Sequence, residues 1–374
     1  MSQNPAKQAP AEQTPGKPFR GHDAWRIVDS SRNRANEGLR VVEDFLRFVL
    51  DDPHLTSLAK QLRHDLQSAC QELPSQSLVA MRDTQGDVGV SIATDSEQRR
   101  DDPLHVCQAS LKRVEQSLRS LEEYGKLLSP LFASRVEALR YRCYTLEKAI
   151  GHTRGALQRL GRVRLCVLVD GGPTPQGFAD LVDALARAGV DALQLRDKRL
   201  SGHALVERAR TLVRIAKPLG VLAIVNDRPD VAAVAGADGV HVGQDDLAVS
   251  DARRIVGPDA LIGVSTHSLA QAGQAVRDGA DYLGAGPTFA SRTKAFDGLA
   301  GLGYLREVSQ QVRLPTFAIG GIDADNLPEV LAAGATRIAV GAAVTAAPDP
   351  AGSVLALKRL LSPPSVPASS SPTP

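Results

Sequence analysis

The chain has 374 residues, a length that predicts two domains. Its formal net charge of +2 and its low aromatic content argue against a nucleic-acid-binding or membrane-surface protein. No apolar run approaches the ~20 residues that a membrane span needs, and the N-terminus lacks the apolar region of a secretory signal. The cysteines are scattered without metal-ligand spacing, which is typical of free thiols in a reducing compartment. We therefore predict a cytoplasmic protein with no nucleic-acid or membrane partner.

The composition divides the chain into four stretches. Residues 1–20 are rich in Pro, Gln and Ala, and residues 362–374 in Ser and Pro, so we predict a disordered tail at each end. Residues 21–157 have the Arg-, Glu- and Leu-rich character of helices. In residues 163–361 short apolar runs alternate with amphipathic segments, which predicts a β/α domain.

In the helical region, Asp29 or Ser30 is predicted to cap a first helix that ends at Asp51–Pro53. Apolar residues of this helix recur at three- and four-residue spacing and predict a buried stripe: Val41, Phe45, Phe48 and Val49. The last helix of the region is predicted at Pro130–Gly151. His152–Gly161 would then form the junction with the next domain.

A faint internal repeat links two of the helical segments. Arg34–Phe45 resembles Arg113–Tyr124 in its Arg, Leu-Arg and paired-acid positions. In a helix, this spacing allows ion pairs between residues four apart: Arg40 with Asp44, and Arg119 with Glu123. The repeat fits a helical bundle with charged surfaces, and a duplicated active site is the alternative.

The second region contains strand-like runs separated by segments with helical spacing: VRLCVLVD, ALQLRDK, VLAIVND, GVHVGQ, LIGVSTH, YLGAGP, TFAIGG and RIAVGAA. Eight β/α units in about 200 residues fit a TIM barrel. An open doubly wound sheet is the alternative, but it rarely needs so many regular units. The predicted fold class is therefore α/β, a C-terminal (β/α)8 TIM barrel preceded by a mostly α-helical domain.

Active sites of such barrels lie at the carboxyl ends of the strands. The residues at these ends are, in chain order, Gln194, Arg196, Asp197 and Lys198; Asn226 and Asp227; Gln244, Asp245 and Asp246; Ser265, Thr266 and His267; Ser291, Arg292, Thr293 and Lys294; Gly320 and Gly321; Gly341 and Ala342. Cations after strands two and six, with acids after strands three and four, suit a diphosphate bound with Mg2+. Glycines after the last two strands suit a phosphate held by backbone N–H groups. Together these features indicate a transferase with diphosphate as the leaving group.

Some of these residues have simpler interpretations. Asp245 is interpreted as a helix N-cap, whereas Asp227 and Asp246 on neighbouring strands are predicted to form a metal site. His241 falls inside a strand and is interpreted as a core histidine with satisfied hydrogen bonds. His267 is either an acid/base or part of a structural hydrogen bond.

Several motifs occur in order at the strand ends: QLRDK (194–198), ND (226–227), GVHVGQDD (239–246), GVSTH (263–267), GPTFASRTK (286–294) and AIGGI (318–322). Together they resemble the thiamine-phosphate synthase family over residues 163–361. The resemblance implies a transferase that joins 4-amino-2-methyl-5-hydroxymethylpyrimidine diphosphate to a thiazole phosphate. Departure of diphosphate would leave a pyrimidine methylene cation, which the thiazole nitrogen attacks. Such chemistry needs electrostatic stabilisation more than a strong base.

The resemblance also implies roles for the matching positions. The pyrimidine diphosphate would be held by Gln194, Leu195, Arg196, Asp197, Lys198, Asn226, Ser265 and Lys294, and among these Arg196, Lys198 and Lys294 would be catalytic. Mg2+ would be held by Asp227 and Asp246. The thiazole phosphate would be held by Ser291, Arg292, Thr293, Gly321, Gly341 and Ala342. Ser291 stands where the family usually has threonine, and Ala342 where it often has serine, so only a backbone contact is expected from Ala342.

The helical region resembles an extension of some long family members, to which hydroxymethylpyrimidine-phosphate kinase activity has been assigned. Its polar candidates are Asn33, Arg34, Glu37, Arg40, Arg82, Asp83 and Asp87, and it has no Walker-type phosphate loop. A dimerisation or scaffolding module is the alternative, which leaves a homo-oligomer open.

Two other functions compete for the barrel. A thiazole tautomerase would need no metal and would use His267 as the acid/base. A non-catalytic barrel fused to a helical interaction module would show gaps in the motifs, where only Thr-to-Ser and Ser-to-Ala changes occur. The full set of cations and acids favours the synthase, acting on small-molecule substrates.

Overall fold

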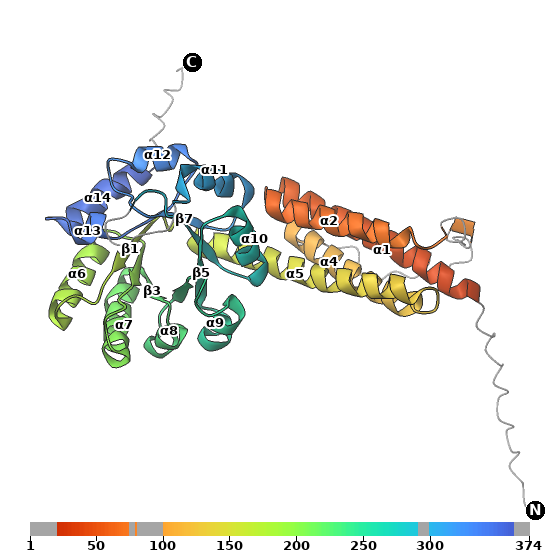
Figure 1. Ribbon diagram of the computed structural model, residues 1–374, viewed down its shortest axis with the longest axis horizontal. Coiled ribbons are helices and arrows are strands. Elements are labelled where there is room, and N and C mark those ends of the chain that lie inside the picture. Colours follow the sequence, from red (N-terminus) through yellow and green to blue (C-terminus); the bar gives the residue numbers. More distant parts are fainter. Residues whose placement is uncertain (1–20, 75–78, 81–99, 291–298, 363–374) are drawn as a thin grey trace, which may run out of the picture.

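The computed structural model describes residues 21–74, 79–80, 100–290 and 299–362. A bundle of long helices lies at one side of a β/α barrel, and one of its helices, α5, runs from the bundle to the barrel (Figure 1). The predicted fold class is confirmed. No helix within the described residues combines the length and the apolar composition that a bilayer crossing requires.

Eight parallel strands close into one barrel in the order of the sequence, from β1 to β8. The strands are β1 Leu165–Val169, β2 Ala192–Leu195, β3 Leu222–Asn226, β4 Gly239–Val242, β5 Leu261–Thr266, β6 Tyr282–Ala285, β7 Thr316–Ile319 and β8 Ile338–Val340. Each of the eight predicted runs contains one of these strands. The open doubly wound sheet is thereby excluded, because β1 pairs with β8.

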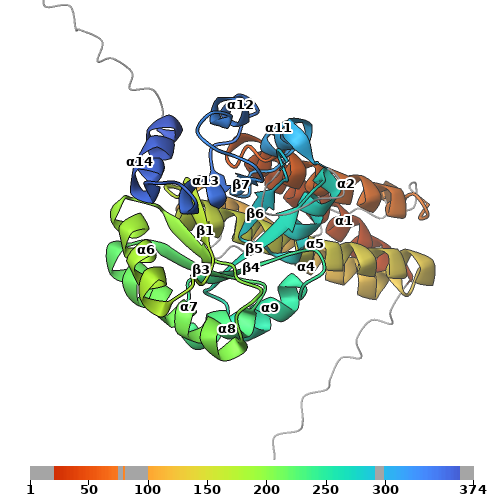
Figure 2. The same ribbon diagram turned by 60° about the vertical axis from the view of Figure 1, so that its left-hand side comes forward.

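Helices surround the strands as an outer ring (Figure 2). They are α6 Pro175–Arg187, α7 Gly202–Ala216, α8 Pro229–Ala235, α9 Val249–Val256, α10 Leu269–Asp278, α11 Gly301–Gln311, α12 Leu327–Ala332, α13 Ala342–Thr345 and α14 Pro350–Leu361. Several begin at a side-chain cap, as where Thr174 accepts from the Gly177 N–H before α6 and Ser268 accepts from the Gln271 N–H before α10. Such caps satisfy backbone donors at the start of a helix.

Side chains along each strand alternate between the barrel interior and the surrounding helices. The interior nearest the strand starts is filled by an inner cluster of buried residues: Leu160, Val163, Cys166, Ala192, Ile224, Leu261, Tyr282, Phe317 and Ala339. The barrel is therefore closed at its amino end. Polar side chains beyond this cluster lie towards the opposite rim.

In the helical domain, α1 spans Gly21–Phe48, α2 Pro53–Cys70, α4 Pro103–Gly125 and α5 Pro130–Leu160. The predicted cap at Asp29 or Ser30 is wrong, because both residues lie inside α1. Asp29 is buried and its carboxylate accepts a hydrogen bond from Arg32 at 3.0 Å. Asp29 thus pairs with an arginine one helical turn away instead of capping the helix.

The predicted buried stripe of α1 is largely wrong. Phe45 is buried, but Val41, Phe48 and Val49 are 37%, 68% and 56% exposed. The residues that are buried instead include Ala35, Leu39, Val42 and Leu46. Both sets have helical spacing, so periodicity alone cannot choose between them. Packing of α1 against α2 and α4 decides which face is covered.

The repeat corresponds to two similar centres of charge. Arg40 lies 3.7 Å from Asp44 and Arg119 lies 2.9 Å from Glu123, so both predicted ion pairs form. The residue before each of these acids, Glu43 or Glu122, is a buried carboxylate that receives an arginine from the following helix.

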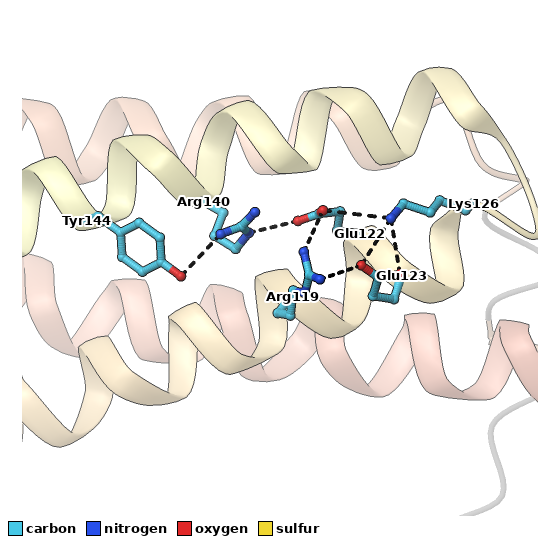
Figure 3. A network of polar contacts seen from close by, with 6 residues as sticks. All are labelled: Arg119, Glu122, Glu123, Lys126, Arg140 and Tyr144. Atoms are coloured by element: carbon cyan, nitrogen blue, oxygen red, sulfur yellow. Dashed lines mark hydrogen bonds and ion pairs between the residues drawn. The ribbon is translucent and has the colours of Figure 1, made fainter.

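The pair in the first half joins Arg63 to Glu43 at 3.1 Å, and the pair in the second joins Arg140 to Glu122 at 2.7 Å. Figure 3 shows the second centre, in which Arg140 also donates to the Tyr144 hydroxyl. The structure thus shows the predicted bundle with repeated ion pairs. The two arginines compensate the cost of burying the Glu43 and Glu122 carboxylates.

The predicted helix end at Gly151 is also wrong, and 152–160 continue α5 rather than form a loop. Leu160, its last residue, belongs to the inner cluster of the barrel. The helical domain also contacts the barrel through Lys148, which donates to the Asp278 carbonyl at 2.6 Å, and through Arg313, which lies 2.7 Å from Asp51. Asp278 and Arg313 precede β6 and β7, so the helical domain docks near the amino ends of the strands.

Leu160→Ala should lower the free energy of unfolding by about 2–5 kcal/mol, because it opens a cavity in the inner cluster. Urea denaturation followed by circular dichroism measures the effect. Leu355→Ala on α14 is the control, since that side chain is 48% exposed and its loss should cost about 0.5 kcal/mol or less. Equal losses in the two variants would show that Leu160 does not close the barrel.

Candidate functional site

The ends of β2, β3 and β4 bring cations and acids together at the carboxyl rim. Lys198 Nζ lies 3.1 Å from Asp227 Oδ2, and the Lys198 side chain is 68% exposed. Asp246, after β4, acts on Asp227 as a hydrogen-bonding and charged neighbour. Residues from three neighbouring strands therefore form one charged cluster, as the strand-end argument predicts.

The surroundings of Asp227 disfavour the ionisation of its carboxyl. Burial and the nearby Asp246 raise the pKa of Asp227, and Lys198 lowers it by a smaller amount. Asp227 has a φ of +62°, in the left-handed region that non-glycine residues rarely adopt. Its backbone N–H donates to the His241 carbonyl at 2.8 Å, which holds this conformation in place. Charge repulsion and backbone strain thus coincide at one residue, a combination that is frequent at functional sites.

The donors present suit a hard divalent cation. Within the described residues no group of three or more His, Cys, Asp and Glu side chains has a metal-binding arrangement. Mg2+ is commonly held by one or two carboxylates, with substrate phosphates and water completing the shell. A cation between Asp227 and Asp246 would also relieve the repulsion that raises the Asp227 pKa.

The loop after β4 orients Asp246. Its Oδ2 atom accepts a hydrogen bond from the Gly243 N–H at 2.7 Å. The interpretation of Asp245 as a helix cap is wrong, because α9 begins after Ala248, which makes no side-chain cap. Asp245 is exposed in the preceding turn.

Two residues of the QLRDK segment, Leu195 and Asp197, make contacts within the protein itself. Leu195 is fully buried in the cluster between the strands and the outer helices, since it alternates with the inward-facing Gln194. Its predicted substrate contact is therefore not available to its side chain. The Asp197 carboxylate accepts from the Arg199 guanidinium and from the backbone N–H groups of Arg199 and Gly171. Burial opposes its ionisation, but these contacts, the guanidinium first, lower the Asp197 pKa to about 2. Asp197 thus connects the loops after β1 and β2 by hydrogen bonds.

A chain of polar side chains inside the barrel begins at Tyr282, a member of the inner cluster. His241 Nε2 lies 2.9 Å from Ser265 Oγ, and His241 Nδ1 lies 3.2 Å from the Tyr282 hydroxyl. Gln194, buried on β2, is a hydrogen-bonding neighbour of the same hydroxyl. The interpretation of His241 as a satisfied core histidine is confirmed. Sequence reasoning missed Tyr282, although its position at the start of β6 and the period of two along that strand mark it as inward-facing.

Three of the remaining predicted contacts, Gly321, Gly341 and Ala342, lie at the ends of β7 and β8. Gly321 has a φ of +65°, and a Cβ atom there would come within 2.5 Å of the Ala290 carbonyl oxygen. Glycine is therefore required by the neighbouring loop, whether or not a phosphate binds. Gly341 and Ala342 open the short helix α13 directly after β8. Four further predicted contacts lie outside the described residues: Ser291, Arg292, Thr293 and Lys294.

His267 forms a structural hydrogen bond. Its Nδ1 atom lies 2.5 Å from the Gly286 carbonyl oxygen, so the neutral ring or the imidazolium donates there. Its backbone N–H donates to Gln271 Oε1 at 2.7 Å. Of the two interpretations left open, the structure therefore supports the structural one.

The candidates of the helical domain are only partly described. Arg34 and Glu37 are exposed on α1, and Arg40 lies close to Glu43 and Asp44. Asn33 is half-buried on the same helix, as a possible partner of Arg32 at 3.5 Å. The other candidates, Arg82, Asp83 and Asp87, lie outside the described residues.

The raised pKa of Asp227 predicts how stability changes with pH. A carboxyl whose folded pKa exceeds its unfolded value favours folding most at low pH and loses that contribution as pH rises through the folded pKa. Asp227→Asn should therefore raise the melting temperature at pH 7 without metal, and the gain should shrink towards pH 4. Asp227→Ala should be less stable than Asp227→Asn by about 1 kcal/mol, because Asn tolerates a positive φ better than Ala.

Asp230→Asn is the matched control of opposite sign. Arg228 holds the pKa of Asp230 below its usual range, so removing this charge should lower the melting temperature at pH 7. Thermal melts at both pH values compare the three variants. A lower melting temperature of Asp227→Asn at pH 7 would contradict the repulsion between Asp227 and Asp246.

Comparisons with known proteins show which family the chain resembles. A family model described as "Thiamine monophosphate synthase" matches residues 165–344, and one described as "ThiD2 family" matches residues 26–149. A thiamine-phosphate synthase from Rhodopirellula baltica is 43% identical over 85% of this chain and 88% of its own length. One from Gloeobacter violaceus is 43% identical over 87% of this chain and 93% of its own. A solved structure of thiamine phosphate pyrophosphorylase from Pyrococcus furiosus is 35% identical, covers 53% of this chain and 95% of its own, and has a TM-score of 0.49.

The two bacterial relatives are similar to this chain across both of its domains, and the family model for the synthase covers the barrel from β1 to α13. Both relatives are named as the synthase, not as a thiazole tautomerase or a non-catalytic barrel. The chain therefore belongs to the thiamine-phosphate synthase family, and it is a transferase of thiamine phosphate synthesis.

Proposed function

We propose that the chain makes thiamine phosphate by a Mg2+-dependent displacement of diphosphate at the carboxyl rim of the barrel. The observation that carries the proposal is the cluster of Lys198, Asp227 and Asp246. Two neighbouring carboxylates, one of which has a raised pKa, lie next to an exposed lysine and suit a cation and a phosphate together.

Asp227 and Asp246 would hold the Mg2+. When bound, the metal would neutralise charge on the diphosphate and so make it a better leaving group. The strained backbone of Asp227 and the hydrogen bond from Gly243 to Asp246 set the positions of both carboxylates before the substrate arrives. This pre-organisation lowers the cost of binding.

Arg196 and Lys198 would bind the departing diphosphate. Lys198 is exposed and paired with Asp227, so it can turn towards a phosphate oxygen once a second cation neutralises that carboxylate. Arg196 follows β2, and its positive charge is close enough to His241 to lower the pKa of that histidine. Arg196 would therefore lie at the inner edge of the rim. Lys294 has the same proposed role, by its position in the family motif.

The attacking thiazole nitrogen needs no general base, since it carries a lone pair and no proton to remove. In agreement, His267 is engaged with the Gly286 carbonyl. The thiazole phosphate would lie at the ends of β7 and β8, where Gly341 and Ala342 open α13. Among the described residues, the nearest atom to a Cβ placed at Gly341 would be Leu168 Cβ, at 3.9 Å. Pyrimidine and thiazole would thus approach from different parts of one rim.

The kinase activity that the resemblance implies for the helical domain stays a prediction. Full-length protein can be supplied with ATP, pyrimidine monophosphate and thiazole phosphate. Formation of thiamine phosphate from the monophosphate would support a kinase. Its absence, while the diphosphate is still used, would favour the scaffolding alternative, which the docking contacts of Lys148 and Arg313 also support.

Asp246→Asn should reduce thiamine phosphate formation by at least about a hundredfold, since it removes half of the proposed metal site. The assay mixes pyrimidine diphosphate and thiazole phosphate with the protein, with Mg2+ or with a chelator. The matched control is Asp245→Asn, which removes the adjacent exposed carboxylate and should leave the rate unchanged. Equal rates with Mg2+ and with chelator would overturn the metal requirement, while absence of product under both conditions would overturn the synthase itself.

A further inference from the structure

We propose that Asp197 is a positioning residue for the departing diphosphate, because it ties the loop after β2 to the loop after β1 and thereby fixes Lys198 beside Asp227. The inference rests on the proposed function, in which Lys198 binds the diphosphate. The resemblance to the family implies a substrate contact for Asp197 itself, but its side chain is only 2% exposed. Asp197 therefore acts on the substrate through Lys198.

The Asp197 carboxylate accepts hydrogen bonds from both loops. Its Oδ2 atom accepts from the Gly171 N–H at 3.1 Å, in the loop after β1, and its Oδ1 atom accepts from the Arg199 N–H at 2.8 Å, in its own loop. The Arg199 guanidinium covers both oxygens, with Nε 3.3 Å from Oδ1 and a terminal nitrogen 3.2 Å from Oδ2. The same guanidinium lies 3.1 Å from Asp170 Oδ2 and makes a second link between the loops. Charge-assisted bonds to a buried carboxylate are strong, so this arrangement fixes the path of the loop after β2.

The loop after β1 is held at the same point from the other side. The Gly171 carbonyl accepts from Nε of Arg208 at 2.7 Å, and Arg208 is a buried residue of α7 whose guanidinium lies 5.7 Å from the centre of the Phe178 ring. A Cβ atom at Gly171 would lie 3.4 Å from Asp197 Oδ2 and closer still to the Leu200 side chain, so the two loops are in close contact here. Asp197 is therefore bonded to a loop that a buried arginine already holds.

The pairing of β2 with β1 continues into the loop that carries Lys198. The Arg196 N–H donates to the Val169 carbonyl at 2.8 Å, one residue beyond the end of β2. Successive side chains of an extended segment point to opposite sides. Asp197 points to the loop after β1, so the adjacent Lys198 points away from it, and its Nζ atom lies 3.1 Å from Asp227 Oδ2. The anchored carboxylate thus sets the direction of the lysine.

Lys198 depends on this anchor because little else holds it. Its side chain is 68% exposed, and its partner within the described residues is Asp227. Ordering a long, exposed lysine side chain costs conformational entropy. A backbone that already directs the lysine to the charged cluster reduces the part of this cost that substrate binding must offset.

Asp197→Asn tests the proposal, because it keeps the size of the side chain but replaces one acceptor oxygen by an amide group. In the full-length enzyme with Mg2+, we expect kcat/KM for the pyrimidine diphosphate to fall about ten- to a hundredfold, the effect of misplacing a binding group by about 1 Å. The KM for the thiazole phosphate should stay unchanged, since its proposed contacts after β7 and β8 are on other strands. If Asp197→Asn fails to fold, Arg199→Gln decides, because it removes an exposed guanidinium that contributes little stability. Unchanged kinetics in that variant would overturn the proposal.

Asp191→Asn is the matched control at the other end of the same strand. The Asp191 carboxylate accepts from the backbone N–H groups of Arg164 and Leu165, both at 2.9 Å, and lies 2.6 Å from Lys358 Nζ. It has the same kinds of partner as Asp197, two backbone N–H groups and a cation, but at the amino end of the barrel. Asp191→Asn should lose comparable stability in thermal melts and keep the kinetics of the unmodified enzyme. Equal losses of kcat/KM in the two variants would show that Asp197 is only structural.

Lys198→Ala separates the positioning role from the proposed function. If Lys198→Ala lowers kcat/KM and Asp197→Asn does not, the positioning role is wrong while the diphosphate contact holds. If Lys198→Ala has no effect, the contact is wrong and the positioning role falls with it. If both lower it, the double variant decides. A loss well below the product of the two single losses supports action through Lys198, and a loss equal to that product overturns it.

Discussion

Closure of the parallel barrel is the constraint on which the rest of this structure depends. Because each strand runs in the same direction, all the carboxyl ends meet at one rim, and residues far apart in the chain become neighbours there. The inner cluster fills the other end of the barrel. The charged cluster of Lys198, Asp227 and Asp246 lies at the open rim.

The charged cluster contains an unfavourable repulsion between Asp227 and Asp246, which a bound cation would reduce. Asp227 combines a raised pKa with a left-handed backbone, and Lys198 offsets the repulsion from Asp246 only in part. A free enzyme in this state is less stable than it could be, which is common where binding groups are pre-organised. Beneath it, His241 has the opposite character. Burial lowers its pKa, and its two ring nitrogens have partners inside the barrel, Tyr282 and Ser265.

The helical domain is joined to the barrel at the end remote from this rim. Helix α5 enters the barrel at Leu160, and the contacts of Lys148 and Arg313 lie near the amino ends of β6 and β7. Among the described residues of one chain, the helical domain therefore contacts the barrel away from the rim that carries the proposed site. Its buried pairs, Glu43 with Arg63 and Glu122 with Arg140, stabilise a bundle whose two halves are related by the sequence repeat.

The sequence by itself determined the features that depend on local pattern: the eight strands, the residues at their ends, and the ion pairs four residues apart in the helices. Alternation along a strand and spacing along a helix are local properties, and the strand direction in β/α units follows from their connections. The sequence could not decide the buried face of α1, the continuation of α5 through 152–160 or the uncapped start of α9. These depend on which element packs against which. Only the tertiary structure brought Tyr282 beside His241 and Gln194, because their contact crosses the barrel and exists only once the sheet has closed.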